Sequence, residues 1–210
     1  HSFIDYCTIM IMLLRAGMNR TTAGVDEAGR GPIAGPVFAA AVILDDDMVI
    51  DGLTDSKRLS AKKREQLFEV ILSQSRAYGI AFASVDEIDQ LNIRQASLLA
   101  MRRAVEQLSI PPDLVQVDGC DAPEWQYETQ TIVKGDLTHS CISAASILAK
   151  VSRDRVMHDL HQQYPMYAFD RHMGYPTRLH LEKLTAFGPI VYHRKTFAPI
   201  KKLIIGRQNT

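Results

Sequence analysis

The 210-residue sequence predicts an α/β protein in which helices flank a mixed sheet. Five short apolar runs have the composition of β-strands, and amphipathic stretches of helical spacing separate some of them. One run, residues 36–44, is almost continuously apolar, as in a strand buried on both faces. Three β-runs precede the strongest amphipathic helix, and two more follow it. This order favours a mixed sheet over a purely alternating, doubly wound one.

The β-runs are expected at residues 22–25, 36–44, 78–84, 114–117 and 129–133. Helices are expected at residues 61–75, 92–108, 141–159 and near 177–187. Ser60 is a suitable N-cap for the first helix. The second carries apolar residues along one face and stops at Pro111. The segment 164–176, with its prolines and Gly174, is the one candidate domain boundary.

Composition excludes several classes of protein. Basic and acidic side chains number 24 each, and no repeat or run of like charges indicates a fibrous or disordered chain. The most apolar stretch, residues 7–14, is far shorter than the roughly twenty residues of a membrane span. The three cysteines have no paired spacing, which argues against disulfides and a zinc site and favours a reducing, cytoplasmic compartment.

Charge is distributed unevenly along the chain. Residues 1–170 hold 16 basic and 23 acidic side chains, whereas residues 171–210 hold eight basic and one acidic. The basic segment also contains aromatic residues and histidines, namely His172, Tyr175, His180, Tyr192, His193 and Phe197. This composition suits contact with a polyanion, although a basic tail can equally be a solvated surface.

The densest motif is residues 24–32, GVDEAGRGP, between the first two β-runs. A phosphate-binding loop is excluded because Arg30-Gly31 replaces the required lysine and hydroxyl residue. A dinucleotide fingerprint fits the glycines but requires a helix where residues 36–44 look like a strand. The third interpretation starts from the adjacent carboxylates Asp26 and Glu27. In an extended chain they point to opposite faces, so they suit two ions, or one ion and its water shell.

Two further carboxylates follow apolar β-runs: Asp118 after residues 115–117, and Asp136 after residues 132–135. If these strands are neighbours, Asp26, Glu27, Asp118 and Asp136 converge on one patch of oxygen ligands. Such ligands select magnesium or manganese over zinc. The alternative is that each aspartate only begins a turn.

Several motifs in collinear order resemble the ribonuclease HII family, over about residues 23–203. They are Asp26-Glu27-Ala28-Gly29-Arg30-Gly31-Pro32, Asp55-Ser56-Lys57, Val117-Asp118-Gly119, Lys134-Gly135-Asp136, Ser143-Ala144-Ala145-Ser146-Ile147 through Lys150, and Gly174-Tyr175-Pro176-Thr177. The resemblance implies a ribonuclease H-like mixed five-stranded sheet flanked by helices. Residues 1–20 would be an N-terminal extension, the part before Met18 being upstream sequence. Residues 21–165 would be the catalytic domain, and residues 166–210 a small, basic, helical C-terminal extension.

The resemblance also implies an activity. The chain would be an endonuclease that cleaves the RNA strand of RNA/DNA hybrids and nicks 5′ of single ribonucleotides in duplex DNA, leaving 3′-hydroxyl and 5′-phosphate ends. Two Mg²⁺ or Mn²⁺ ions would be held by Asp26, Glu27, Asp118 and Asp136. We expect a monomer without membrane contact. The alternatives are a noncatalytic nucleic-acid-binding module and, less favoured, a dinucleotide-binding enzyme.

Substrate contacts are expected from two groups of residues. The resemblance places recognition of the ribose 2′-hydroxyl on Gly29, Arg30 and Gly31, with Tyr175 packing on the adjoining sugar. Phosphate contacts are expected from Lys57, Ser143, Ser146, Lys150 and Arg153, four of which share the first turns of one helix. For Lys150 and Arg153 the alternative is an exposed helix charge without a substrate.

Overall fold

A computed structural model describes residues 20–45, 48, 50–53, 56 and 59–208. Its centre is one five-stranded sheet, made of β1 (Thr22–Ala28), β2 (Val37–Ile43), β3 (Ala77–Ala83), β4 (Leu114–Asp118) and β5 (Glu128–Ile132). The strands lie in the order β3-β2-β1-β4-β5. β1 pairs antiparallel with β2 and parallel with β4, so the sheet is mixed, as predicted.

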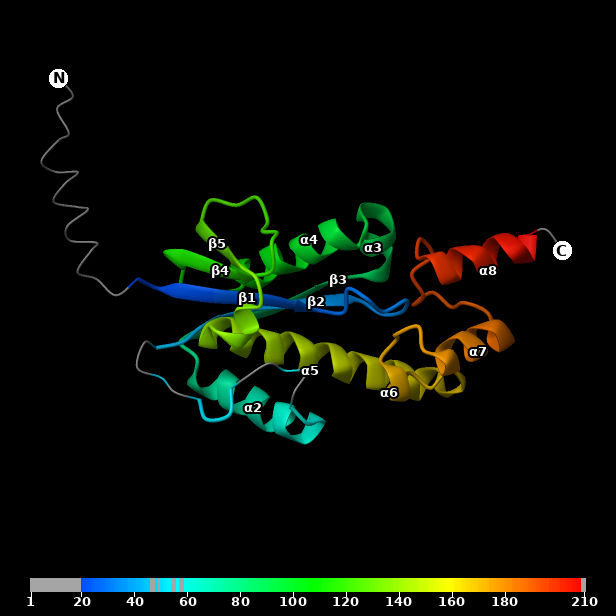
Figure 1. Cartoon of the computed structure of the whole chain (residues 1–210), viewed down its shortest axis with the longest axis horizontal. Helices are drawn as coiled ribbons and strands as arrows, with labels where there is room; N and C mark the ends of the chain where they lie inside the picture. Colours follow the sequence, from blue (N-terminus) through cyan, green and yellow to red (C-terminus); the bar gives the residue numbers. More distant parts are fainter. Residues whose placement is uncertain (1–19, 46–47, 49, 54–55, 57–58, 209–210) are drawn as a thin grey trace, which may run out of the picture.

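The helices are α2 (Ala61–Gln74), α3 (Val85–Leu91), α4 (Ile93–Glu106), α5 (Ser140–Gln163), α6 (Phe169–His172), α7 (Arg178–Phe187) and α8 (Ala198–Gln208). Short 3₁₀ turns lie at Gly135–Leu137 and Pro165–Tyr167. Figure 1 shows α3 and α4 on one side of the sheet, α5 and α2 on the other, and α7 and α8 at the end remote from the N-terminus. No helix in the described part is long and apolar enough to cross a membrane.

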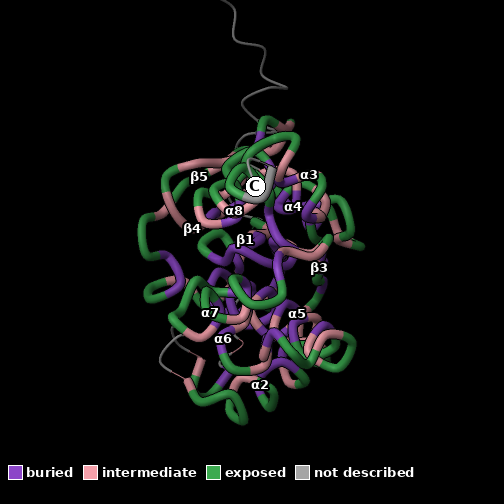
Figure 2. The backbone as a smooth tube through the Cα atoms, turned by 90° about the vertical axis from the view of Figure 1, so that its right-hand side faces the viewer, coloured by how far each residue is buried: buried purple, intermediate pink, exposed green. Residues whose placement is uncertain are grey.

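Strand β2 explains the three-layer arrangement, because every residue of it is buried. Val37, Ala39 and Ala41 belong to the core that contains the alanines of α4. Ala40 and Val42 belong to the core formed with α5 and α2. The alternation of a strand therefore supplies both cores, and the buried residues run through the middle of the molecule in Figure 2.

Two glycines allow the helices to approach the sheet closely. A Cβ atom on Gly24 of β1 would lie 2.2 Å from the backbone carbonyl carbon of Cys141 in α5. A Cβ atom on Gly79 of β3 would lie 2.0 Å from the carbonyl oxygen of Ala104 in α4. The helix backbones consequently pack almost against the strands. Ala144, Ala145 and Ala149 of α5, which we expected to allow this approach, are fully buried.

The prediction of a mixed sheet with helices on it is confirmed, but several boundaries were wrong. β1 runs on through residues 26–28, which pair with residues 38–40 of β2, so Asp26 and Glu27 lie within the strand. Helix α3, whose start is a capping box between Ser84 and Glu87, was not predicted. Nor was α8 predicted, since Pro199 in its first turn reads as a break unless the helix start is known.

Candidate active site

The positions of Asp26 and Glu27 are set by strand β1, which lies in the middle of the sheet. β1 pairs with β4 up to Val25 opposite Val117, and then continues alongside β2 alone. Asp26 lies opposite Ala40, on the α5 side, and Glu27 lies opposite Ala39, on the α4 side. The two carboxylates therefore approach the end of β4 from opposite faces, as strand alternation predicts. The backbone N–H of Glu27 donates to Oδ1 of Asp26 at 2.7 Å.

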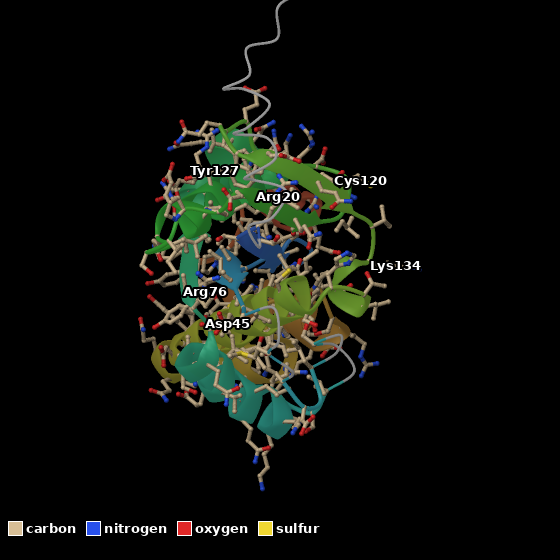
Figure 3. The ribbon with its side chains drawn as sticks, turned by 90° about the vertical axis from the view of Figure 1, so that its left-hand side faces the viewer. Arg20, Asp45, Arg76, Cys120, Tyr127 and Lys134 are labelled. Atoms are coloured by element: carbon tan, nitrogen blue, oxygen red, sulfur yellow. The ribbon has the colours of Figure 1, made fainter. Side chains whose placement is uncertain are left out.

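Asp118 is the last residue of β4, one position beyond the pairing of Val25 with Val117. Its Oδ1 accepts a 2.7 Å hydrogen bond from the backbone N–H of Gly135. This bond ties β4 to the turn that carries the buried Asp136. Lys134, in the left-handed conformation, begins that turn. Cys120 follows Asp118 by two residues, and Lys134 precedes Asp136 by two. Figure 3 shows both labelled residues on the same side of the molecule.

The pKa values of Asp26 and Glu27 reflect both their burial and the charges of neighbouring carboxylates. Burial raises the pKa of the Asp26 carboxyl well above its usual range, and the charges of Glu27 and Asp118 raise it further. The adjacent Ser146 hydroxyl partly opposes this shift in the pKa of Asp26. Burial also raises the pKa of Glu27, with Arg30 opposing and Asp118 adding to the increase. Clustered negative charge of this kind is relieved by protons or by cations.

The donor chemistry fits a divalent cation that prefers oxygen ligands, because the clustered ionisable groups Asp26, Glu27 and Asp118 are carboxylates. In the described part of the chain, however, no three acidic, histidine or cysteine side chains converge closely enough, as they stand, to enclose a metal ion. Asp26 and Glu27 leave the strand on opposite faces, which explains the separation.

The loop between β1 and β2 lies beside the carboxylates, with Arg30 and Gly31 exposed and Gly29 buried. Gly29 has φ +103°, a conformation that favours glycine. A Cβ atom on Gly31 would lie 3.2 Å from Cε1 of Tyr175. The ring of Tyr175, 44% exposed, thus covers Gly31. The structure brings the predicted sugar-reading residues together, although they are some 145 positions apart in sequence.

A cleft of about 280 Å³ opens next to these groups. Glu27 and Asp118 line it from the sheet, Arg30 from the loop after β1, and Arg94 and Met101 from α4. Arg94 forms a two-pronged ion pair with Asp121, at 2.9 and 2.7 Å. A larger groove of about 400 Å³, between Phe38, Phe82 and Tyr192, is mainly apolar and lacks converging carboxylates. The smaller cleft is therefore the candidate active site.

The residues expected to contact phosphates differ from one another in burial and in their hydrogen-bond partners. Lys57 lies outside the described residues. Ser146 is buried, and its hydroxyl is 2.9 Å from that of Ser56. Ser143 is buried too, and its hydroxyl has no hydrogen-bond partner in the described part. Lys150 is paired with Asp154 at 2.6 Å, one turn further along α5.

Arg153 does not lie where a phosphate contact was expected. Its side chain is 1% exposed, and its guanidinium donates to the carbonyl oxygens of Ala34, Pro36 and Met173 at 3.0–3.1 Å. All three acceptors belong to backbone next to the glycine loop or Tyr175. Arg153 was predicted to be accessible at the surface because helical spacing alone cannot show that this face of α5 is covered by the C-terminal segment, residues 166–210.

The histidines of the basic segment also differ from expectation. His172, His180 and His193 are buried, so they do not face a polyanion. His180 donates from Nδ1 to the carbonyl of Tyr175 and accepts at Nε2 from Nε2 of His193. His193 accepts at Nδ1 from the N–H of Ile190, which fixes this arrangement. Each ring is thereby satisfied in its neutral form, and burial lowers the pKa of His180 to about 4 and that of His193 to about 4.

Sequence reasoning missed Arg194, a buried cation among the basic C-terminal residues 166–210. Its guanidinium donates to the carbonyl oxygens of Gly29, Arg30, Gly35 and Pro36. Within the printed sequence it is one of several basic residues between 193 and 202, and nothing in its neighbours marks it as buried. Burial lowers the pKa of Arg194 to about 9, so it remains a cation at neutral pH.

A mixed sheet with carboxylates at the adjoining ends of β1 and β4, next to a cleft lined by Glu27 and Asp118, is the arrangement of a hydrolase of the ribonuclease H class. Residues 23–199 match the family model described as ribonuclease HII. Ribonuclease HII of Coxiella burnetii is 56% identical over 185 residues, which cover 88% of this chain and 92% of the relative. That of Burkholderia cenocepacia is 57% identical over 178 residues, covering 85% and 83%.

A solved structure agrees with these relatives. The crystal structure of ribonuclease H2 from Pyrococcus horikoshii is 27% identical and has a TM-score of 0.78, covering 90% of this chain and 100% of that one. The chain belongs to the ribonuclease HII family. It is accordingly a metal-dependent hydrolase with ribonuclease H activity, which removes the noncatalytic binding module as an explanation. The dinucleotide-binding alternative is also wrong, because the glycine loop leads into β2 and not into a helix.

Proposed function

We propose that this chain cleaves the RNA strand of RNA/DNA hybrids and nicks duplex DNA on the 5′ side of a single embedded ribonucleotide. Water adds to the phosphorus, the bond to the preceding 3′-oxygen breaks, and that oxygen takes up a proton. The products carry a 3′-hydroxyl and a 5′-phosphate. The observation that carries this proposal is the meeting of Asp26, Glu27 and Asp118 where β1 and β4 separate, beside the glycine loop.

Asp26, Glu27, Asp118 and Asp136 are the proposed ligands of two divalent cations, Mg²⁺ or Mn²⁺. When bound, such ions polarise the phosphate, activate water and stabilise the departing 3′-oxygen. The carboxylates of this chain hold the negative charge that draws the ions in. The Gly135–Asp118 hydrogen bond keeps the turn of Asp136 next to the end of β4. The Ser146 hydroxyl next to Asp26 favours its ionised form, which is the form a cation needs.

Selection of ribose is assigned to the exposed part of the glycine loop and to Tyr175. A 2′-hydroxyl is the group that distinguishes RNA from DNA locally, and a backbone N–H without a side chain in the way can reach it. The ring of Tyr175 lies over Gly31 and is open to solvent, so a sugar in the cleft can pack against it. We also propose that Lys57, Ser143, Ser146 and Lys150 act near the phosphates, Lys150 by exchanging its partner Asp154.

Three end-labelled duplexes of one sequence test the proposal: an RNA/DNA hybrid, a duplex with one ribonucleotide, and an all-DNA duplex. We expect cleavage of the first two with Mg²⁺ or Mn²⁺, none after chelation, and none of the third. The nicked product should be extended by a DNA polymerase, which requires a 3′-hydroxyl. Cleavage of the all-DNA duplex at a comparable rate contradicts the assignment of ribose selection. A product that cannot be extended contradicts the proposed bond cleavage.

A further inference from the structure

Arg194 is buried in an unusual environment for a cation. Its side chain is 0% exposed, and none of the described carboxylates forms an ion pair with it. Instead the guanidinium donates to four main-chain carbonyl oxygens, at 2.6 Å to Gly29, 3.1 Å to Arg30, 2.9 Å to Gly35 and 3.3 Å to Pro36. A buried charge is costly unless hydrogen bonds satisfy it, and here backbone dipoles do so.

All four acceptors belong to the loop that joins β1 to β2. Arg194 bonds both ends of this loop, and Arg153 bonds one further carbonyl of it, that of Ala34, and shares the carbonyl of Pro36 with Arg194. Gly29 and Gly35 have φ values of +103° and +84°, which let the chain turn its carbonyls inward. The loop therefore wraps around two guanidinium groups, while its Ile33 and Ala34 side chains pack in apolar clusters.

The inward carbonyls determine where the neighbouring amides point. A trans peptide is planar, with its C=O and N–H directed oppositely, and no described peptide bond is cis. The carbonyls of Gly29 and Arg30 face Arg194, so the N–H groups of Arg30 and Gly31 face away from it. Both residues are exposed, and in the described part neither N–H donates a hydrogen bond within the chain. Two backbone donors are thus held free beside Tyr175.

Arg194 is itself fixed by contacts on both sides. The neighbouring His193 forms a β-bridge with Ala34, and the N–H of Arg194 donates to the carbonyl of Ile33 at 2.9 Å. The next two amides, of Lys195 and Thr196, donate to the carboxylate of Asp89 in α3 at 2.9 and 3.0 Å. The side chain therefore reaches the loop from a backbone that is anchored to the rest of the protein.

We propose that Arg194 is a positioning residue for ribose recognition, which orients the N–H groups of Arg30 and Gly31 toward the 2′-hydroxyl. The inference rests on the proposed function and adds a residue of the C-terminal segment to it. Arg194 does not touch the substrate. It acts through the loop, so its loss should reduce discrimination between ribose and deoxyribose while the carboxylate site retains its cations.

The test measures binding, with Ca²⁺ in place of the catalytic ion so that affinity is read apart from cleavage. Dissociation constants are measured for the one-ribonucleotide duplex and the all-DNA duplex, and their ratio is the readout. Wild type, Arg194→Met and Arg194→Lys are compared. Lys195→Met is the matched control, since it removes a neighbouring but exposed cation. Mn²⁺ affinity of each variant is measured without nucleic acid.

We expect Arg194→Met to lower the ratio about tenfold, the value of one well-placed hydrogen bond. Arg194→Lys should lower it less, because an ammonium keeps the charge and some of the hydrogen bonds, although it cannot span four carbonyls. Lys195→Met should leave the ratio within twofold of wild type. The Mn²⁺ affinity of every variant should also stay within twofold of wild type. The proposal is overturned if wild type discriminates between the duplexes and both Arg194 variants keep the wild-type ratio. It is also overturned if both variants lose affinity for the two duplexes equally. If Arg194→Met does not fold, Arg194→Lys alone decides. A wild type that does not discriminate overturns the proposed function itself.

Discussion

Replacing Gly24 by alanine should destabilise this protein through the contact between β1 and α5. The added Cβ would lie 2.2 Å from the carbonyl carbon of Cys141 and 2.3 Å from the nitrogen of Ile142. Real Cβ atoms essentially never come within 3.0 Å of such atoms, so the start of α5 must retreat by about 1 Å. The obstacle is helix backbone, which cannot rotate aside as a side chain could.

Overpacking of this kind costs typically 1–3 kcal/mol, and a rigid backbone places the value near the upper end, at about 3 kcal/mol. For a protein of this size, about 3 kcal/mol corresponds to a fall in melting temperature of about 6–12 °C. Gly24 is also two residues before Asp26, so cleavage should weaken with stability. Circular dichroism melting and urea titration measure the change.

Gly206→Ala is the matched control. It makes the same chemical change in the exposed part of α8, where an added Cβ meets nothing within 4 Å. Alanine is the better helix former, so stability should rise by up to about 1 kcal/mol. The reasoning is refuted if Gly24→Ala melts at or above the wild-type temperature, or if the two variants shift stability in the same direction by similar amounts.

Three further predictions follow from the site. Asp118→Asn should reduce cleavage of the one-ribonucleotide duplex at least about a hundredfold, while duplex affinity stays equal or rises, because a charge facing phosphate is removed; weaker binding with unchanged turnover would contradict this. Tyr175→Ala should lower selectivity for the ribonucleotide in a competition assay with all-DNA duplex, while Mn²⁺ affinity remains; intact selectivity would argue against its packing on the sugar. The pKa values of His180 and His193 are lowered to about 4 in the folded state, so the unfolded chain binds more protons below its ordinary pKa of about 6.5. The free energy of unfolding should therefore fall as pH drops from about 6.5 to 4, by up to about 1.4 kcal/mol per pH unit and histidine. His193→Gln should flatten that slope in urea titrations.

Much of the fold follows from local pattern in the sequence. The apolar run of β2 and the amphipathic face of α4 determine a sheet covered on both sides, because periodicity is a property of neighbouring residues. The boundary of β1 was missed because Asp26 and Glu27 are unusual in a strand interior, and only pairing with β2 keeps them there. The start of α3 was detectable, since Ser84 and Glu87 have the spacing of a capping box.

The sequence by itself determined the family and indicated the candidate side chains for its chemistry: acidic residues near the ends of apolar strands, a glycine-rich turn, and a tyrosine between glycine and proline. Only the tertiary structure decided which of them meet. It placed Tyr175 over Gly31 and buried Arg153, Arg194, His172, His180 and His193, whose burial the sequence did not indicate. The physical reason is that burial depends on what packs against a residue from a distant part of the chain. A basic residue of the C-terminal segment looks the same in sequence whether it faces solvent or the carbonyls of a loop more than 150 residues earlier.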